Sequence, residues 1–246
     1  MILSEQTILI TGGNSGIGRF LVEKLSDQCV HIIVIDKKEN NKFEGFNNIS
    51  YYICDLTDYV SVTETFLKVF EIFPKISILI NNAGLIYSEP LVNILSKKER
   101  RHSYEMWDAT IKANLYTVFN VSSTLIDNML KNKVKGLIIN ISSIAARGNP
   151  GQTSYSAAKA GVNALTYTWS KELAPFGIRV AGISPGFFDT ESTRTALSQA
   201  RIEKITQSIP LKRLGKLDEI LLSLKFIIEN DYLTGRLIEL DGGLSL

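Results

Sequence analysis

Tyr155 and Lys159 are the residues of this chain whose types and spacing most directly suggest chemistry. They lie four positions apart in the segment YSAAK, whose alanines favour a helix, so both side chains would share one helix face. A free tyrosine has a pKa of about 10 and is a weak base at neutral pH. A nearby lysine ammonium favours the phenolate and would let this tyrosine exchange a proton. The alternative is a purely structural arrangement, with a packed tyrosine beside a solvent-exposed lysine.

The segment TGGNSGIG, from Thr11 to Gly18, suggests a turn that binds phosphate. Half of its residues are glycine, and it joins a β-branched run to a helix-like segment. Its spacing differs from the G-x-G-x-x-G of the general dinucleotide fingerprint, but the physics is shared. Glycines let the backbone approach a ligand, and free N–H groups at a helix start attract a pyrophosphate. The alternative is a tight turn that only needs positive φ angles.

Asp36 ends the second apolar run, HIIVID, 24 residues after Gly12. A carboxylate there can accept hydrogen bonds from both ribose hydroxyls of an adenosine and would repel a 2′-phosphate. The alternative is an aspartate that caps a turn or a helix. Lys37 and Lys38 would soften the repulsion, but no lysine or arginine occurs at positions 13–15. The sequence therefore favours NAD over NADP.

The elements that must position these residues follow from alternating apolar and helical patterns. Continuous apolar runs predict strands at residues 7–11, 31–36, 51–55, 76–84, 136–143, 178–186 and 235–243. Helical spacing predicts helices at residues 19–25, 60–73, 105–130, 157–177 and 219–230. Strands that alternate with helices form parallel βαβ units. We therefore expect a Rossmann-like, doubly wound α/β fold: one domain over residues 1–246, with a parallel sheet of about seven strands and helices on both faces.

Composition excludes several other classes of protein. Of the 246 residues 45% are hydrophobic and 21% charged, and the formal net charge of +2 gives no indication of nucleic-acid binding. The basic run KKERR, at 97–101, is expected to be solvated. No signal peptide or membrane span is evident. Cys29 and Cys54 lack metal-ligand spacing and are expected to be buried, reduced thiols, so we predict no metal site and a cytoplasmic protein.

The order of short motifs resembles that of the short-chain dehydrogenase/reductase family, of the compact single-domain type. The segments TGGNSGIG, CDLTD, NNAG, KANLYTVF, NISS, YSAAKAG, SPGFFDT, YLTG and ELDGG occur in the family order from end to end. Several of these motifs are weak alone, but together they are highly specific. The resemblance covers essentially the whole chain.

The resemblance implies a dinucleotide site at the carboxyl edge of the sheet. The turn at the pyrophosphate would comprise Thr11, Gly12, Asn14, Ser15, Gly16, Ile17 and Gly18. Asp36 would bind the adenosine ribose, and Asp55 and Leu56 would line the adenine pocket. The remaining contacts, along the central ribose and the nicotinamide, would come from Asn82, Ala83, Gly84, Tyr155, Lys159, Pro185, Gly186, Phe188 and Thr190.

The resemblance also implies a catalytic set. Tyr155 would exchange the proton, while Lys159 would hold the nicotinamide ribose and lower the tyrosine pKa. Asn114 would kink its helix and hold a water for proton relay. The substrate-binding serine is commonly thirteen residues before the tyrosine, which selects Ser142, whereas alignment of the strand GLIINISS selects Ser143. We favour Ser143 because strand register fixes side-chain direction, whereas loops tolerate deletions.

Two segments either differ from the family pattern or have a role that the sequence does not define. Residues 85–108 are several residues longer than expected and hold Tyr87 and His102. They form either an exposed insertion or a wall of the substrate site with a basic strip for an anionic group. We expect His102 at the surface and assign it no role. Residues 187–210 lie where the family carries a mobile substrate lid.

We therefore expect an oxidoreductase that interconverts a secondary alcohol and a ketone by hydride transfer to or from NAD. The substrate could be a 3-oxoacyl thioester, a hydroxy acid, a polyol or a steroid-like ring. The alternatives are an NAD sensor without turnover and a nucleotide-sugar epimerase or dehydratase. The resemblance further suggests a homotetramer, or else a dimer. One interface would use the final helix and strand, and the other the helices that hold Asn114 and Tyr155.

Overall fold

Seven parallel strands form the centre of the molecule, as the apolar runs predict. The structure is a computed structural model and describes residues 1–39 and 43–244. The strand order is β3-β2-β1-β4-β5-β6-β7, and every neighbouring pair is parallel. The strands are β1 (Thr7–Thr11), β2 (His31–Asp36), β3 (Ile49–Ile53), β4 (Ile78–Asn81), β5 (Gly136–Ile141), β6 (Ile178–Pro185) and β7 (Leu237–Leu240). The predicted doubly wound α/β fold is confirmed.

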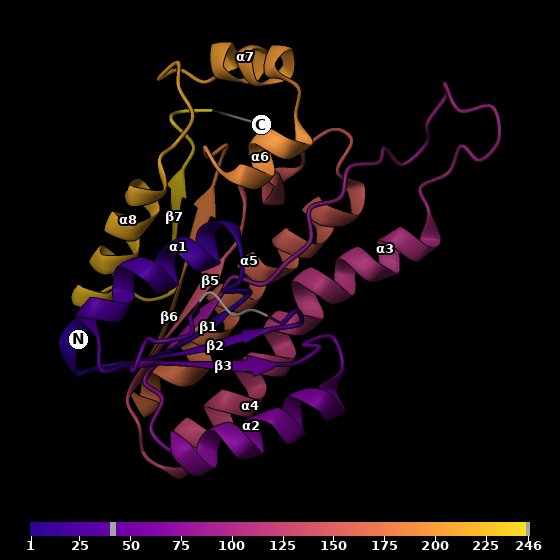
Figure 1. The fold of residues 1–246 in the computed structure, drawn as a ribbon. Coiled ribbons are helices and arrows are strands. Elements are labelled where there is room, and N and C mark those ends of the chain that lie inside the picture. Colours follow the sequence, from indigo (N-terminus) through magenta and orange to yellow (C-terminus); the bar gives the residue numbers. More distant parts are fainter. Residues whose placement is uncertain (40–42, 245–246) are drawn as a thin grey trace.

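Helices cover both faces of this sheet (Figure 1). The helices α1 (Gly16–Leu25) and α8 (Leu217–Glu229) pack on one face. The other face is covered by α2 (Tyr59–Ile72), α4 (Thr117–Lys131) and α5 (Thr153–Leu173). The helix α3 (Tyr104–Ile111) precedes α4, and α6 (Glu191–Ala196) and α7 (Gln199–Ser208) lie beyond the end of β6. Short helical turns occupy Leu3–Glu5, Ser26–Gln28, Ile144–Arg147 and Ala174–Phe176.

The sheet divides the apolar core into two clusters. Ile8 and Ile10 of β1 face the cluster under α1 and α8, whereas Leu9 faces the cluster under α2 and α4. All three side chains are fully buried. Successive strand residues point to opposite faces, so a strand covered on both sides must be apolar throughout. This double cover explains the continuous apolar runs in the sequence.

Several element boundaries differ from the predicted ones. The run 76–84 forms a strand only over Ile78–Asn81, and the run 235–243 only over Leu237–Leu240. The predicted helix 105–130 is interrupted by a π-helical segment, Lys112–Tyr116. Most of the residues of these two runs that follow the strands are polar or glycine, and they form loops at the carboxyl edge.

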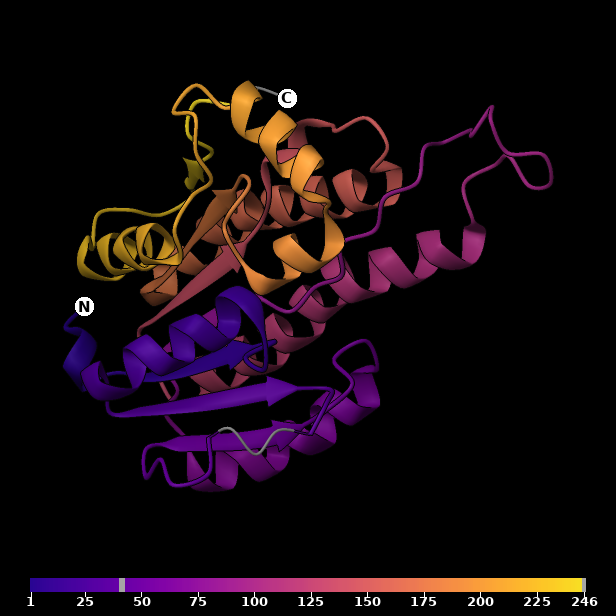
Figure 2. The same cartoon turned by 45° about the horizontal axis from the view of Figure 1, so that its top comes forward.

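The segment 187–210, which the sequence predicts only as a lid, forms two helices in the structure. Figure 2 shows α6 and α7 above the carboxyl ends of the central strands. Thr190 and Ser198 cap them by accepting hydrogen bonds from backbone N–H groups of the first turn. None of the residues of α7 is buried. A helix without a buried face leaves little apolar periodicity in the sequence, so it is difficult to predict.

The two cysteines are free thiols, as expected. Cys54 is buried, but Cys29 is only half-buried, which corrects the predicted burial. Desolvation raises the pKa of Cys29 to about 11, so this thiol is unreactive at neutral pH. Over residues 1–39 and 43–244, no helix combines the length and the apolar character needed to cross a bilayer.

Candidate active site

The glycine turn between β1 and α1 presents bare backbone at the carboxyl edge of the sheet. Gly12 has a φ of +68°, and a Cβ there would lie 2.8 Å from the Cα of Ala83. A Cβ on Gly18 would lie 2.2 Å from the carbonyl oxygen of Gly12. The helix α1 starts at Gly16, and Ser15 provides no side-chain cap to its first N–H groups. Close backbone approach and an uncapped positive helix end suit a pyrophosphate, so the turn fits the expected dinucleotide.

Thr11 and Asn82 brace this turn against the end of β4. The Thr11 hydroxyl accepts hydrogen bonds from the backbone N–H groups of Asn82 and Ala83, at 3.0 and 3.1 Å. In return, the Asn82 amide donates to the carbonyl oxygens of Thr11 and Gly12, at 3.1 and 3.0 Å. The NNAG motif and the glycine turn therefore form one rigid unit. Their expected roles beside the cofactor require this kind of fixed geometry.

Asp36 lies at the end of β2, directly beside the glycine turn. Its carboxylate accepts hydrogen bonds from the backbone N–H groups of Asn14 and Lys38, at 3.1 and 3.3 Å. The Lys37 ammonium lies 4.0 Å from the carboxylate of Asp55. This exposed pair is weak, but it directs the Lys37 ammonium towards Asp55, and the Asp36 carboxylate lies next to the turn.

Asp55 and Leu56 follow β3 at the same edge. Asp55 accepts hydrogen bonds from the backbone N–H and the hydroxyl of Thr57, at 3.0 and 2.7 Å, and these bonds lower its pKa. Leu56 is buried, and its carbonyl oxygen accepts a hydrogen bond of 3.0 Å from the Asn120 amide. The apolar side chain and the fixed loop are compatible with the expected adenine pocket.

Tyr155 and Lys159 lie in the first two turns of α5 and are both buried. The Lys159 ammonium is 5.8 Å from the centroid of the Tyr155 ring and donates a hydrogen bond of 2.8 Å to the carbonyl oxygen of Ile141. Burial lowers the pKa of Lys159 to about 8. Burial raises the pKa of Tyr155, and a hydrogen bond with Ser143 opposes that rise. The lowering of the tyrosine pKa by Lys159 stays a prediction.

The two candidate serines have different surroundings. The Ser142 hydroxyl is buried and donates a hydrogen bond of 2.5 Å to the Asn163 side chain. Ser143 is the serine that lies near enough to Tyr155 to lower the pKa of its phenol. It also accepts a hydrogen bond of 3.1 Å from the N–H of Ala145. The geometry therefore favours Ser143 as the group that would share a substrate oxygen with Tyr155.

Asn114 lies in the π-helical segment that separates α3 from α4 and is fully buried. Its amide nitrogen donates to the carbonyl oxygens of Leu85 and Thr110, at 2.8 and 2.9 Å, and its amide oxygen accepts from the N–H of Leu85 at 3.3 Å. The side chain thus ties the helix to the loop after NNAG. A π-turn displaces backbone groups from the regular ladder, as a water-holding role requires.

Comparison with known proteins agrees with this geometry. Residues 6–201 match the family model described as short chain dehydrogenase. The chain belongs to this family.

The chain is 38% identical to the 3-oxoacyl-(acyl-carrier-protein) reductase of Thermotoga maritima, over 99% of both chains. It is 37% identical to the enzyme of that name from Buchnera aphidicola, again over 99% of both chains. It is also 31% identical to the sorbitol-6-phosphate 2-dehydrogenase of Klebsiella pneumoniae, over 98% of this chain and 96% of that one. The chain is therefore an NAD(P)-dependent oxidoreductase.

The residues that are expected to flank the nicotinamide lie at and after the end of β6. Pro185 ends the strand, and the N–H of Gly186 donates to the carbonyl oxygen of Leu240 at 2.8 Å. The Phe188 ring is buried against Gly215, so this residue can offer only its backbone to a cofactor. Thr190 caps α6 by accepting a hydrogen bond of 3.1 Å from Thr193.

A buried polar network beneath the dehydrogenase site was missed by the sequence reasoning. The Asn81 amide donates to Ser122 and to Asn140, and the Asn140 amide donates to Thr166, each at 2.9 Å. These four residues come from β4, α4, β5 and α5 and are all buried. Asn81 and Asn140 are direct partners in the β4–β5 register. The signal available in the sequence was one asparagine inside each of two apolar runs, Asn81 in 76–84 and Asn140 in 136–143.

The insertion 85–108 contributes its base to the site region. Glu89 pairs with Gln152 as an isolated bridge, and the Gln152 amide donates to the Ser88 hydroxyl at 3.2 Å. Gln152 is three residues before Tyr155, and sequence reasoning missed it. His102 is also not at the surface as expected, since its side chain is only 6% exposed. Most of residues 91–101 are exposed, which agrees with the interpretation as an exposed insertion, whereas a wall of the substrate site stays a prediction for the base of the insertion.

Proposed function

We propose that this dehydrogenase reduces the 3-oxo group of an acyl thioester attached to an acyl carrier protein. The support comes from the full-length likeness to reductases of that name together with the site geometry. The observation that carries the proposal is Tyr155, buried beside Lys159 at the carboxyl edge, with the half-buried Ser143 next to the phenol. This arrangement presents a phenol to a carbonyl oxygen and excludes bulk water.

The residues of the chain supply the proton and the orientation. A bound NADH or NADPH would supply the hydride that adds to the 3-oxo carbon. As that carbon accepts the hydride, the oxygen gains negative charge, and the Tyr155 O–H bond breaks to transfer its proton to the oxygen. Ser143 would hydrogen-bond the same oxygen, and the Lys159 ammonium would stabilise the phenolate left behind. The product is the 3-hydroxyacyl thioester.

We further propose that the cofactor is NAD(H) rather than NADP(H). The support is the carboxylate of Asp36, fixed beside the turn by the N–H groups of Asn14 and Lys38. A 2′-phosphate would meet this charge at close range. Lys37, the nearest cation in the sequence, already lies against Asp55.

The same carboxylate favours a second candidate function, the oxidation of a phosphorylated polyol. One relative carries the name sorbitol-6-phosphate 2-dehydrogenase. A dehydrogenase that removes hydride suits NAD⁺. The two functions use the same proton path in opposite directions.

A substrate panel distinguishes these functions. Purified protein is assayed with NADH and with NADPH on a 3-oxoacyl thioester of the carrier protein, and with NAD⁺ on polyol phosphates. We expect thioester reduction with NADH to give the highest kcat/KM. A higher kcat/KM on a polyol phosphate would reject the reductase proposal in favour of the second function.

The Tyr155→Phe variant tests the assigned proton donor on whichever substrate is turned over. Removal of the phenol hydroxyl should lower kcat by about 10²–10⁴-fold. Binding of NADH, followed by its fluorescence, should change little, because the ring remains. Turnover at the normal rate would show that another group transfers the proton.

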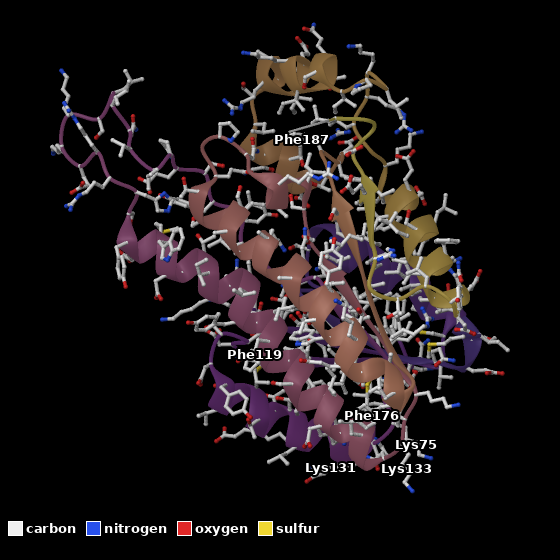
Figure 3. The ribbon with its side chains drawn as sticks, turned by 180° about the vertical axis from the view of Figure 1, so that it is seen from behind. Lys75, Phe119, Lys131, Lys133, Phe176 and Phe187 are labelled. Carbon is white, nitrogen blue, oxygen red and sulfur yellow. The ribbon has the colours of Figure 1, made fainter. Side chains whose placement is uncertain are left out.

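We also propose that the protein works in the cytoplasm as a homo-oligomer. Its two free thiols support a reducing compartment. An apolar groove of about 660 Å³ supports assembly through the α3–α5 face; it is lined by Thr57, Tyr59, Leu115, Tyr116, Phe119, Asn120 and Leu165. Phe119, labelled in Figure 3, is 52% exposed on this face. Sedimentation as a monomer at micromolar concentration would contradict the oligomer.

A further inference from the structure

Residues 91–101 form a hairpin that leaves the body of the molecule, here named the basic arm. The N–H of Asn93 donates to the carbonyl oxygen of Arg100 at 2.6 Å, and the N–H of His102 donates to that of Leu91 at 2.9 Å. Val92 and Arg101 pair as antiparallel partners. Figures 1 and 2 show the arm extending past the start of α3, away from the sheet and from α7. A hairpin held by its own hydrogen bonds keeps a defined direction.

A partly buried cluster, here named the clamp, holds the base of the basic arm. The Glu89 carboxylate accepts hydrogen bonds from the N–H of Ser103 and from the Tyr87 hydroxyl, at 2.7 and 3.1 Å. The His102 ring packs edge-on against the rings of Tyr87 and Trp107, with centroids 5.9 and 6.2 Å away. The clamp therefore joins the two ends of the arm and positions it beside the active site.

The same clamp is connected to the loop before Tyr155. Glu89 pairs with Gln152, which also donates a hydrogen bond to Ser88. A molecule held by the basic arm is thus held next to the mouth of the site. The arm itself extends outward, so its tip points away from the sheet and its site residues (Figures 1 and 2). Its ligand must be large.

The surface of the basic arm combines positive charge with exposed apolar side chains. It holds four basic residues and one acidic residue, while the whole chain has 27 basic and 25 acidic residues. Lys97, Lys98 and Arg100 form no ion pair with any residue in the described ranges 1–39 and 43–244. Ile94 and Leu95 at the tip are 78% and 87% exposed. Cations that flank apolar side chains are complementary to an acidic protein surface with an apolar groove.

We propose that the basic arm docks an acidic protein that carries the thioester substrate. This inference rests on the proposed reductase function and adds the place where the carrier binds. A second copy of the chain fits less well, because the charges of the rest of the chain nearly balance and give it no net negative charge to attract the arm. Nucleic acid fits less well because Ile94 and Leu95 would gain nothing from phosphates.

The test compares one substrate in two forms. Kinetics are measured with a 3-oxoacyl thioester on the carrier protein and with the same acyl group on N-acetylcysteamine, for wild type and for the triple variant K97E/K98E/R100E. We expect kcat/KM on the carrier-bound form to fall about tenfold or more, mostly through KM, with a weaker dependence on salt. The small thioester should react as with wild type.

A matched control changes the same number of charges at the other end of the molecule. Figure 3 shows Lys75, Lys131 and Lys133 at the end opposite the basic arm. The variant K75E/K131E/K133E should react normally with both thioesters. A second arm variant, I94D/L95D, should also weaken only the carrier-bound reaction, which separates the apolar contribution from the charge.

The outcomes separate the two proposals. Equal kinetics of wild type and K97E/K98E/R100E on the carrier-bound form would overturn the docking inference and leave the reductase function standing. Equal losses on both thioesters would overturn it as well. A changed sedimentation coefficient of the arm variants would assign the arm to contacts between copies and reject the carrier. If wild type reduces neither thioester, the proposed function itself fails, and the docking inference fails with it.

Discussion

The two halves of the sheet build their parts of the site in opposite ways. Beside β1–β3 the site is mostly backbone, with the turn around Gly12 and Gly18 free of side chains and the carboxylate of Asp36 at the rim. Beside β4–β6 the site is made of buried side chains, and Asn114, Tyr155 and Lys159 are at least 93% buried. A phosphate needs close approach of N–H groups, whereas proton transfer needs functional groups held away from water.

Because of this difference, we expect mutations in the two halves of the sheet to impair the protein for different reasons. On the cofactor side, an atom added where backbone segments approach closely, as at Gly12 and Gly18, is harmful because no space is left for it. On the catalytic side, a removed polar group is harmful because its buried partners lose their hydrogen bonds. Four substitutions test this contrast, two from each half.

Gly18→Val should have the largest effect. A Cβ at this position would lie 2.2 Å from the carbonyl oxygen of Gly12 and 2.4 Å from the Asn82 amide nitrogen, so backbone must move. We expect loss of measurable NADH binding and a fall of several kcal/mol in the free energy of unfolding. Fluorescence titration and urea unfolding measure both quantities.

Gly16→Ala is the matched control for this turn. Its φ is +54°, but an added Cβ meets nothing within 4 Å. It should therefore cost only about 1–2 kcal/mol of backbone strain. If Gly18→Val bound NADH as well as Gly16→Ala does, close packing would not be the reason for the glycine.

Lys159→Met should have the next largest effect, on the catalytic rate. Removal of the ammonium leaves Tyr155 with a pKa raised by burial, without a nearby cation to stabilise its phenolate. Alcohol oxidation requires the phenolate, so its pH–rate profile should move to higher pH, and kcat at neutral pH should fall about 10²–10³-fold. A profile that keeps its position in Lys159→Met would contradict the electrostatic role, and Lys159→Arg, which keeps the charge, should shift it less.

The same lysine makes stability depend on pH. Burial lowers the pKa of Lys159 to about 8 in the folded chain, whereas a lysine exposed to water has a pKa of 10.5. Between these values the unfolded chain binds more protons, so the free energy of unfolding of the ligand-free wild type should increase as pH rises from about 8 to about 10.5. Urea unfolding at several pH values should show this slope in wild type and a smaller slope in Lys159→Met.

Asn140→Leu should act on stability more than on chemistry. The substitution leaves the Asn81 amide and the Thr166 hydroxyl without their common partner in the core. We expect a loss of about 1–3 kcal/mol in the free energy of unfolding. Thr63→Ala removes a hydroxyl that bonds its own helix at the surface and should change stability by less than about 0.5 kcal/mol. Equal effects of the two substitutions would show that the network contributes little.

The contrast between the halves also explains what the sequence could predict. The strands, the glycine turn and the Tyr155–Lys159 pair follow from local constraints: apolar runs, missing side chains and the spacing of one helix face. The Asn81–Asn140 contact depends on the register of two strands that are nearly sixty residues apart in the chain. The clamp between Glu89 and Ser103 joins residues with no periodic pattern between them. Contacts of this kind cannot be predicted from local sequence patterns, because they depend on how distant segments pack in the folded chain.

Asp36→Asn should have the smallest effect and tests the rim of the cofactor half. The N–H groups of Asn14 and Lys38 bond different oxygens of the Asp36 carboxylate, so the single amide oxygen of the variant keeps one of these two hydrogen bonds and the loop loses the other. Loss of the negative charge should move the ratio of kcat/KM values for NADH and NADPH about tenfold towards NADPH, which corresponds to about 1.4 kcal/mol. Because Lys37 is engaged with Asp55, the variant should not gain a strong phosphate site. If the wild-type enzyme already prefers NADPH, another group must neutralise the charge of Asp36. The comparison between the rim of the cofactor half and the buried catalytic half would then not explain cofactor choice.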